Sequence, residues 1–179
     1  MKIVCIFDDR LFAFHYADKE HNEYERLLNN WGNISFLRSF VKEHLPTIDH
    51  NKYINSLIDE LEELEDFIID IADNYQADFD QFFAPLYNSE YKEVQLSLRK
   101  GKLPRIFPRA EFRIYGIKID ENCYVITGGA IKLSQKMQDH ELTQLELDKM
   151  DLCKKYLIEQ EILNKETFFE LIEESNEDN

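Results

Sequence analysis

The chain has 179 residues, of which 44% are hydrophobic and 13% aromatic, so it is long and apolar enough to fold as a single domain over 1–179. Its net charge of −15 argues against nucleic acid as a ligand of the surface as a whole. No apolar run approaches the about 20 residues of a membrane helix, and the N-terminus is charged too early for a signal peptide. We therefore expect a cytoplasmic protein with no membrane association.

The first segment of the chain is predicted to hold a β-hairpin and two short helices. Two β-rich runs, 3–7 and 11–16, flank Asp8 and Asp9, whose residue types favour a tight turn over a metal site. Apolar residues then recur at helical spacing over 19–41, and Gly32 interrupts them.

The most regular predicted helix covers 52–72. Its apolar stripe faces away from a set of seven carboxylates, which are Asp59, Glu60, Glu62, Glu63, Glu65, Asp66 and Asp70. Clustered carboxylates can bind a metal ion, but on an amphipathic helix they more often form its solvated side. We predict a solvated face and neither a metal nor another cofactor.

Charge divides the chain into three segments. Residues 1–80 carry −11 and residues 141–179 carry −8, whereas residues 81–140 carry +4. Such asymmetry can mark an anion-binding face, and it fits equally well a basic segment that offsets the charge of acidic helices beside it. Within the basic segment, 97–108 is rich in glycine, proline and basic residues, which predicts an extended, partly exposed loop.

Two antiparallel strands are predicted over 112–119 and 123–127, joined by a turn. Arg113 and Tyr115 lie two residues apart on the first strand, so they share one of its faces. A cation and a phenol would thus point the same way.

The second of these strands ends at Gly128 and Gly129, where the backbone can bend or approach a neighbour closely. A third short strand over 130–133 is expected to carry Lys132. Two glycines followed by a lysine suggest phosphate binding, but the spacing of a nucleotide-binding loop is absent. A bulged strand whose lysine faces water explains the same pattern.

The C-terminal part is predicted to be helical. Residues 143–146 have the form of a capping box, with Thr143 and Glu146 at the start of a helix that continues to about 160. A shorter helix is expected over 167–173. The cysteines, Cys5, Cys123 and Cys153, each lie in an apolar pattern and are expected to be reduced core thiols.

Residues 112–115 and 129–136, with the turn and strand between them and the helix after them, resemble the RelE/HigB-like toxin superfamily. In the HigB-like branch an "LRIxY" strand is followed by a strand ending in small residues and then by a lysine-rich segment and a helix. The resemblance covers about 82–160. It implies an α+β fold, a small antiparallel sheet packed by helices, to which this chain adds an N-terminal β-hairpin and acidic helices in 1–80.

The resemblance also implies a chemistry, because these proteins are ribosome-associated endoribonucleases that cleave mRNA without a metal ion. In such a reaction a 2'-hydroxyl attacks the adjacent phosphodiester, which requires a base, an acid and cations for the phosphorane. Arg113 would stabilise the phosphate, and Lys132 and Lys136 would contact it or transfer protons. Tyr115 would stack on a base, and His140 is a candidate acid or base.

Further basic residues and two kinds of partner complete the expectation. Lys100, Lys102, Arg105 and Arg109 would extend the track that binds RNA. Partners of such a toxin are a helix-turn-helix antitoxin, the ribosome and mRNA. One alternative is a non-enzymatic binding or regulatory protein on the same fold, whose acidic helices engage a basic protein partner. Another is a structural domain whose basic middle only balances its flanks.

Overall fold

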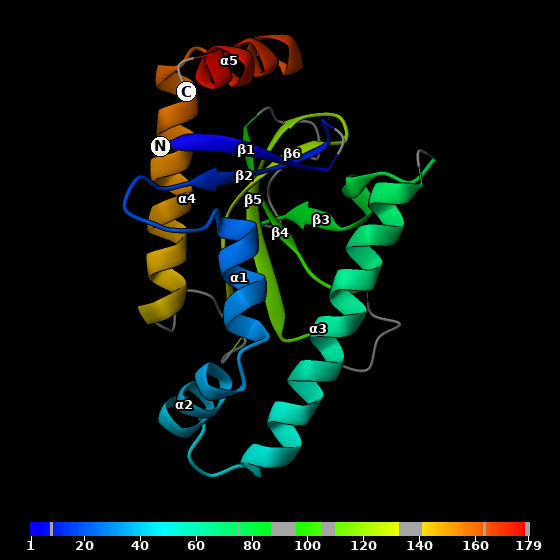
Figure 1. The fold of residues 1–179 in the computed structure, drawn as a ribbon, viewed down its shortest axis with the longest axis vertical. Coiled ribbons are helices and arrows are strands. Elements are labelled where there is room, and N and C mark those ends of the chain that lie inside the picture. The colour runs from blue at the N-terminus through cyan, green and yellow to red at the C-terminus, as the bar shows by residue number, and fades with distance from the viewer. Residues whose placement is uncertain are drawn as a thin grey trace.

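The computed structural model describes residues 1–7, 9–74, 76–86, 96–104, 110–132, 141–162 and 164–177. Within these ranges the protein has an α+β fold, with helices packed on both faces of one six-stranded mixed sheet (Figure 1). The predicted α+β class is confirmed, but the sheet is mixed and not wholly antiparallel as the resemblance implies. No helix in the described ranges is both long and apolar enough to cross a membrane.

The sheet joins the N-terminal hairpin to the central strands. In spatial order its strands are β1 (Lys2–Phe7), β2 (Leu11–His15), β6 (Cys123–Ile131), β5 (Phe112–Asp120), β4 (Ser97–Gly101) and β3 (Phe83–Pro85). Only β2 and β6 are parallel, and the other neighbours are antiparallel. The predicted hairpin and the predicted pair β5 and β6 are confirmed, although Asp8 lies outside the described residues.

Three helices form the layer on one face of the sheet: α1 (Glu23–Trp31), α3 (His50–Asp73) and α2 (Ile34–His44), which packs against the other two. The Asn33 side chain accepts hydrogen bonds from the N–H groups of Ser35 and Phe36, which begins α2 directly after the predicted break at Gly32. Aromatic stacking joins this layer to the sheet, because the rings of Trp31 and Phe112 have centroids 4.3 Å apart.

The opposite face is covered by α4 (Glu141–Glu159) and α5 (Lys165–Glu177). Their apolar side chains meet those of β2, β5 and β6, and Phe168 packs edge-on against Phe12 at 4.9 Å between ring centroids. A short 3-10 helix, η1 (Phe79–Gln81), precedes β3. Arg10, at the turn of the hairpin, donates to the carbonyl oxygens of Ile71 and Ala72 and so satisfies the C-terminal end of α3.

The structure corrects the prediction of a loop over 97–108. Residues 97–101 form β4, because β3 and β5 pair with both edges of this segment, and Arg99 within it is only 2% exposed. Lys102 and Leu103 follow the strand, and 105–108 lie outside the described residues.

Two further predictions about the central region are corrected. The strand predicted over 130–133 is not separate, because β6 continues through both glycines to Ile131; residue 133 lies outside the described residues. Neither glycine has a positive φ. The helix α4 spans Glu141–Glu159, so the backbone of Thr143 lies inside the helix and not at its start as predicted.

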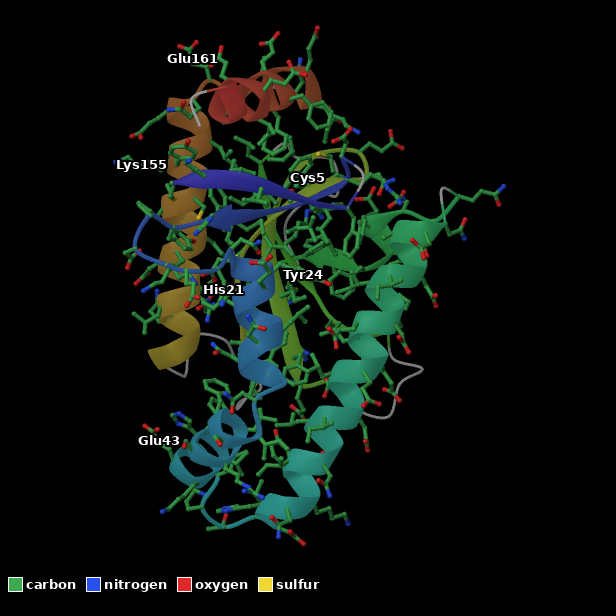
Figure 2. The ribbon with its side chains drawn as sticks, in the orientation of Figure 1. Cys5, His21, Tyr24, Glu43, Lys155 and Glu161 are labelled. Carbon is green, nitrogen blue, oxygen red and sulfur yellow. The ribbon has the colours of Figure 1, made fainter. Side chains whose placement is uncertain are left out.

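Two side chains also differ from prediction in their burial. Cys5 is exposed, whereas Cys123 and Cys153 are buried as predicted, and all three are free thiols (Figure 2). Glu60, predicted on the solvated side of α3, is only 3% exposed. Its carboxylate turns inward because it bonds to backbone N–H groups at the start of β5.

Candidate anion-binding site

Three cationic side chains gather where β4 and β6 end and β5 begins. The strand register pairs Lys100 with Tyr115 and Arg113 with Ala130, and Lys132 directly follows β6. Directly paired residues and residues two apart on a strand share a sheet face. Lys100, Arg113 and Lys132 therefore lie on the face that α4 covers, at the same end of the sheet. We call them the cation cluster.

Backbone oxygens hold two of these cations in place. Arg113 is half-buried, and its Nη1 donates to the carbonyl oxygens of Ala110 at 2.6 Å and Phe112 at 2.7 Å. Lys100 is also half-buried, and its Nζ donates to the carbonyl oxygen of Leu86 at 3.1 Å. Both side chains are thus ordered before any ligand arrives.

The cation cluster has no paired carboxylate among the residues that the structure describes. Lys132 is exposed, and in the described part of the chain none of the three cations forms an ion pair within 4 Å. Burial lowers the pKa of Lys100, and the positive charges of Arg113 and Lys132 lower it further. Burial also lowers the pKa of Arg113, and the nearby Tyr115, Glu60 and Glu111 oppose that effect. Lys100 is therefore repelled by the other two cations, which an anion would relieve.

Tyr115 lies beneath the cation cluster and is buried, with 2% of its surface exposed. Burial, opposed by Arg113 and reinforced by Glu146, raises the pKa of its phenol to about 12. In this structure the ring is a packing element below the cations and is not presented for stacking on a base.

Of the five other residues predicted for the site, the structure describes one. Lys102 follows β4 at the same end of the sheet and is half-buried. Arg105, Arg109, Lys136 and His140 lie outside the described residues. Of the predicted site, the structure brings together Lys100, Arg113 and Lys132, with Tyr115 below them.

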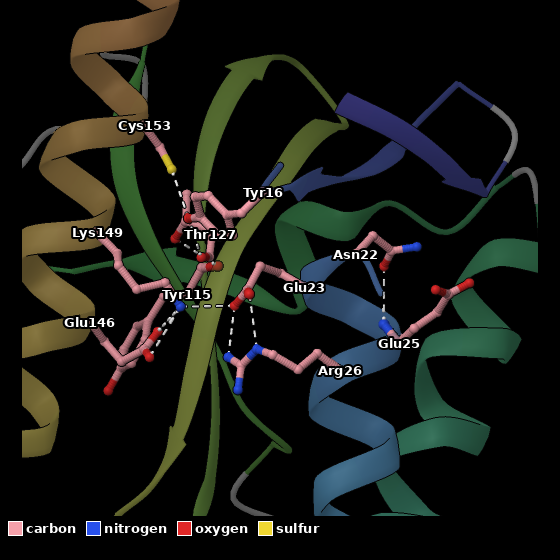
Figure 3. Close-up of polar contacts among 10 residues, drawn as sticks. All are labelled: Tyr16, Asn22, Glu23, Glu25, Arg26, Tyr115, Thr127, Glu146, Lys149 and Cys153. Atoms are coloured by element: carbon pink, nitrogen blue, oxygen red, sulfur yellow. Dashed lines mark hydrogen bonds and ion pairs between the residues drawn. The ribbon is translucent and has the colours of Figure 1, made fainter. Parts of the chain in front are cut away.

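A second charged group, which sequence reasoning missed, lies beside β6 and joins α1 to α4, helices that cover opposite faces of the sheet (Figure 3). Glu23 accepts from Nε of Arg26 at 2.8 Å and from its Nη2 at 2.7 Å. Lys149 bridges the helices, with its Nζ 2.8 Å from Glu23 Oε2 and 3.2 Å from Glu146 Oε1. We call these four residues the α1–α4 network.

Charge is balanced within the α1–α4 network. The Glu23 side chain is 2% exposed, and its two cations outweigh the effect of burial and lower the pKa of its carboxyl. For Glu146 burial dominates, and its pKa is raised despite Lys149. The two cations and the two carboxylates form ion pairs with one another, so the α1–α4 network has a structural role in linking the two helices.

Tyr16 and Cys153 extend this network without adding a nucleophile. The Tyr16 hydroxyl donates to the Thr127 carbonyl oxygen at 3.0 Å and lies 3.1 Å from Cys153 Sγ (Figure 3). Burial raises the pKa of Cys153 to about 11, so the group is a thiol at neutral pH. A thiol of this kind is not an activated nucleophile.

Glycine residues allow the network to approach the sheet. A Cβ at Gly128 would collide with Glu146 Oε2, and one at Gly129 would lie 2.6 Å from the carbonyl oxygen of Arg113 and 2.8 Å from Leu27 Cδ1. The expectation of close approach at the two glycines is therefore confirmed. The neighbours are side chains and backbone of the protein itself.

Neither a metal-binding group nor a similar known protein gives further information on the function of these residues. No group of three or more His, Cys, Asp or Glu side chains in the described ranges is arranged to hold a metal ion. No protein-family model, curated protein or solved structure matches the chain. The functional argument therefore rests on the residues of the site.

Proposed function

We propose that the protein is a toxin-like, ribosome-associated endoribonuclease that binds the phosphates of mRNA at Lys100, Arg113 and Lys132. The observation that supports this most is the cation cluster itself, whose charges lack an ion pair among the described residues of a chain with net charge −15. A guanidinium between two ammonium groups suits phosphate, which accepts several charge-assisted hydrogen bonds at once.

The proposed reaction transfers phosphorus within one RNA strand. The 2'-oxygen attacks the adjacent phosphorus as a base takes its proton, and the bond to the 5'-oxygen breaks as an acid supplies one. The products are a cyclic 2',3'-phosphate and a 5'-hydroxyl. Arg113 stabilises the additional negative charge of the phosphorane, while Lys132, Lys136 and His140 are the candidates for proton transfer.

Binding must be local, because the remainder of the surface repels RNA. In the proposal, Lys102, Arg105 and Arg109 extend the track from the cation cluster, and the ribosome presents the mRNA. A helix-turn-helix antitoxin encoded beside the toxin would hold it inactive. Screening by salt weakens both the attraction at the cluster and the repulsion elsewhere, so activity is best measured at fixed ionic strength.

The test compares the wild type with Arg113→Gln and with Arg38→Gln, a control that removes an exposed arginine on α2. Cleavage of mRNA in the presence of ribosomes is followed by mapping the new 5' ends. We expect Arg113→Gln to lose on the order of 10²-fold in rate, the usual effect of removing one group that stabilises transition-state charge. Arg38→Gln should retain the wild-type rate.

Growth of expressing cells provides a second readout of the same three proteins. Wild type and Arg38→Gln should arrest growth, and Arg113→Gln should relieve the arrest. If the wild type neither cleaves mRNA with ribosomes nor arrests growth, the proposal is wrong.

A second candidate function is favoured by the outer side of α3. Asp59, Glu62, Asp66 and Asp70 are exposed there and form no ion pair with the described residues. We propose as the alternative a non-enzymatic protein whose α3 engages a basic protein partner. Neutralising Glu62, Glu63 and Asp66 together should then abolish recovery of that partner in a pull-down, while Arg113→Gln should not affect it.

A further inference from the structure

Glu60 differs from the other carboxylates of α3 because it is buried under the start of β5. Its Oε1 accepts the backbone N–H groups of Glu111 at 2.6 Å and Phe112 at 2.8 Å. Its Oε2 is also buried and meets no hydrogen-bond donor in the described part of the chain. A carboxylate in this position is costly to keep ionised.

The same two peptide units, Ala110–Glu111 and Glu111–Phe112, also bond to two residues of the cation cluster. The carbonyl oxygen of Ala110 accepts Nη1 of Arg113 at 2.6 Å. The carbonyl oxygen of Glu111 accepts the backbone N–H of Lys132 at 2.8 Å. Each peptide unit therefore meets Glu60 on one side and a residue of the cation cluster on the other.

We propose that Glu60 is a positioning residue for the cation cluster, acting through the backbone of Glu111 and Phe112. One carboxylate oxygen gathers two successive N–H groups and fixes the path by which the chain enters β5. Arg113 and Lys132 take their positions from that path. The ligand of the positioned cluster is RNA phosphate, so this part of the inference rests on the proposed function.

Three variants separate positioning from general stability. Glu60→Gln keeps an acceptor oxygen and removes the charge, whereas Glu60→Leu keeps the bulk and removes the acceptor. Ile68→Ala, at a fully buried position two turns further along α3, is a control that destabilises the same helix without touching the site. Urea unfolding first establishes conditions under which every variant is fully folded.

The first measurement is the affinity for a short single-stranded RNA as a function of salt, by fluorescence anisotropy. Glu60→Leu should weaken binding at least tenfold and reduce the salt slope by about 1, as if one phosphate contact were lost. The RNA affinity of Glu60→Gln should stay within about threefold of that of the wild type, and the affinity of Ile68→Ala should equal that of the wild type. Equal losses for Glu60→Leu and Ile68→Ala would overturn the inference.

A double-mutant cycle shows whether Glu60 acts through Arg113. In a chain that already carries Arg113→Gln, adding Glu60→Leu should cost less than threefold in RNA affinity, because the group that it positions is gone. Strictly additive losses would show that Glu60 acts independently of Arg113 and would contradict the inference.

The final measurement needs no RNA: it is the exchange rate of the amide hydrogens of Glu111, Phe112 and Lys132 in the free protein. Glu60→Leu should accelerate exchange at all three amides, and Glu60→Gln should not. Unchanged protection in Glu60→Leu would overturn the positioning role itself. If protection falls while wild type binds no RNA, the proposed function is wrong and Glu60 organises this end of the sheet for another purpose.

Discussion

The cation cluster and the α1–α4 network both lie near β6, yet their charges are arranged in opposite ways. In the α1–α4 network, Lys149 lies 2.8 Å from Glu23 and bridges two helices that are far apart in sequence. In the cation cluster, Lys100 and Arg113 donate only to neutral carbonyl oxygens among the described residues. The balanced charges of the α1–α4 network indicate a structural role, whereas the unpaired cations of the cluster can bind an anion.

The pKa values follow the same division. Paired cations lower the pKa of Glu23 even though it is buried, so its ionised form stabilises the fold. Burial and, to a lesser degree, the like charges of Arg113 and Lys132 lower the pKa of Lys100, so its charged form is disfavoured until an anion binds. Substitutions in the α1–α4 network should therefore change stability, and those in the cation cluster should change binding.

The largest expected effect comes from Glu23→Ala, which leaves Arg26 and Lys149 without their shared carboxylate. We expect the free energy of unfolding in urea to fall by about 3 kcal/mol, the usual cost of breaking a buried charge pair. Glu25→Ala, which removes an exposed carboxylate from the same helix, should cost less than about 0.5 kcal/mol. RNA affinity of folded Glu23→Ala should be unchanged, and a loss of affinity would remove the distinction between the two groups.

The next effect separates the two glycines of β6. A Cβ at Gly129 would meet the backbone oxygen of Arg113, which cannot move freely, so Gly129→Ala should destabilise the protein by about 2 kcal/mol. A Cβ at Gly128 would meet the ends of the flexible Glu146 and Lys149 side chains, so Gly128→Ala should cost about 1 kcal/mol. Thermal unfolding of both variants measures the difference, and the reverse order would contradict this account.

Short-range patterns predicted most of the elements correctly. The hairpin, α1, α2, α3 and the pair β5 and β6 were all visible, because each depends on periodicity or turn residues within a few positions. The strand β4 was mistaken for a loop because its glycine and basic residues are typical of exposed segments. Its two neighbouring strands, which come from elsewhere in the chain, supply the pairing that makes it a strand.

The candidate site was only partly predictable for the same reason. Arg113 and Tyr115 share a face by strand period alone, but the approach of Lys100 depends on strand register between distant segments. Glu60 looked like one more solvated carboxylate, since nothing near it in sequence shows that α3 crosses the start of β5. The ion pair of Glu23 with Lys149 joins residues 126 positions apart, which no local pattern in the sequence indicates.

A smaller effect should come from reversing one exposed charge in the cation cluster. Lys132→Glu should weaken binding of single-stranded RNA by about tenfold, because it places a carboxylate beside the phosphate. The control is Lys155→Glu on the outer side of α4 (Figure 2), which changes the net charge equally and should weaken binding by less than about twofold. Equal losses would mean that RNA responds to total charge and not to the cluster.

The smallest effect contrasts two buried carboxylates by the sign of their pH dependence. The pKa of Glu23 is lowered in the folded state, so its stabilising contribution is present above about pH 4.3 and is lost on acidification. Burial raises the pKa of Glu60, opposed in part by its two backbone hydrogen bonds, so its ionised form weakens the fold as pH rises above about 4.3.

Urea unfolding of Glu23→Gln and Glu60→Gln at a series of pH values therefore measures opposite trends. At pH 7, Glu23→Gln should be less stable than wild type, and Glu60→Gln should be more stable by about 1 kcal/mol. Both differences should shrink as the pH falls below about 4.3, because protonated glutamate and glutamine are then both neutral. A Glu60→Gln variant that is less stable than wild type at pH 7 would show that an ionised Glu60 stabilises the start of β5, as Glu23 stabilises the α1–α4 network.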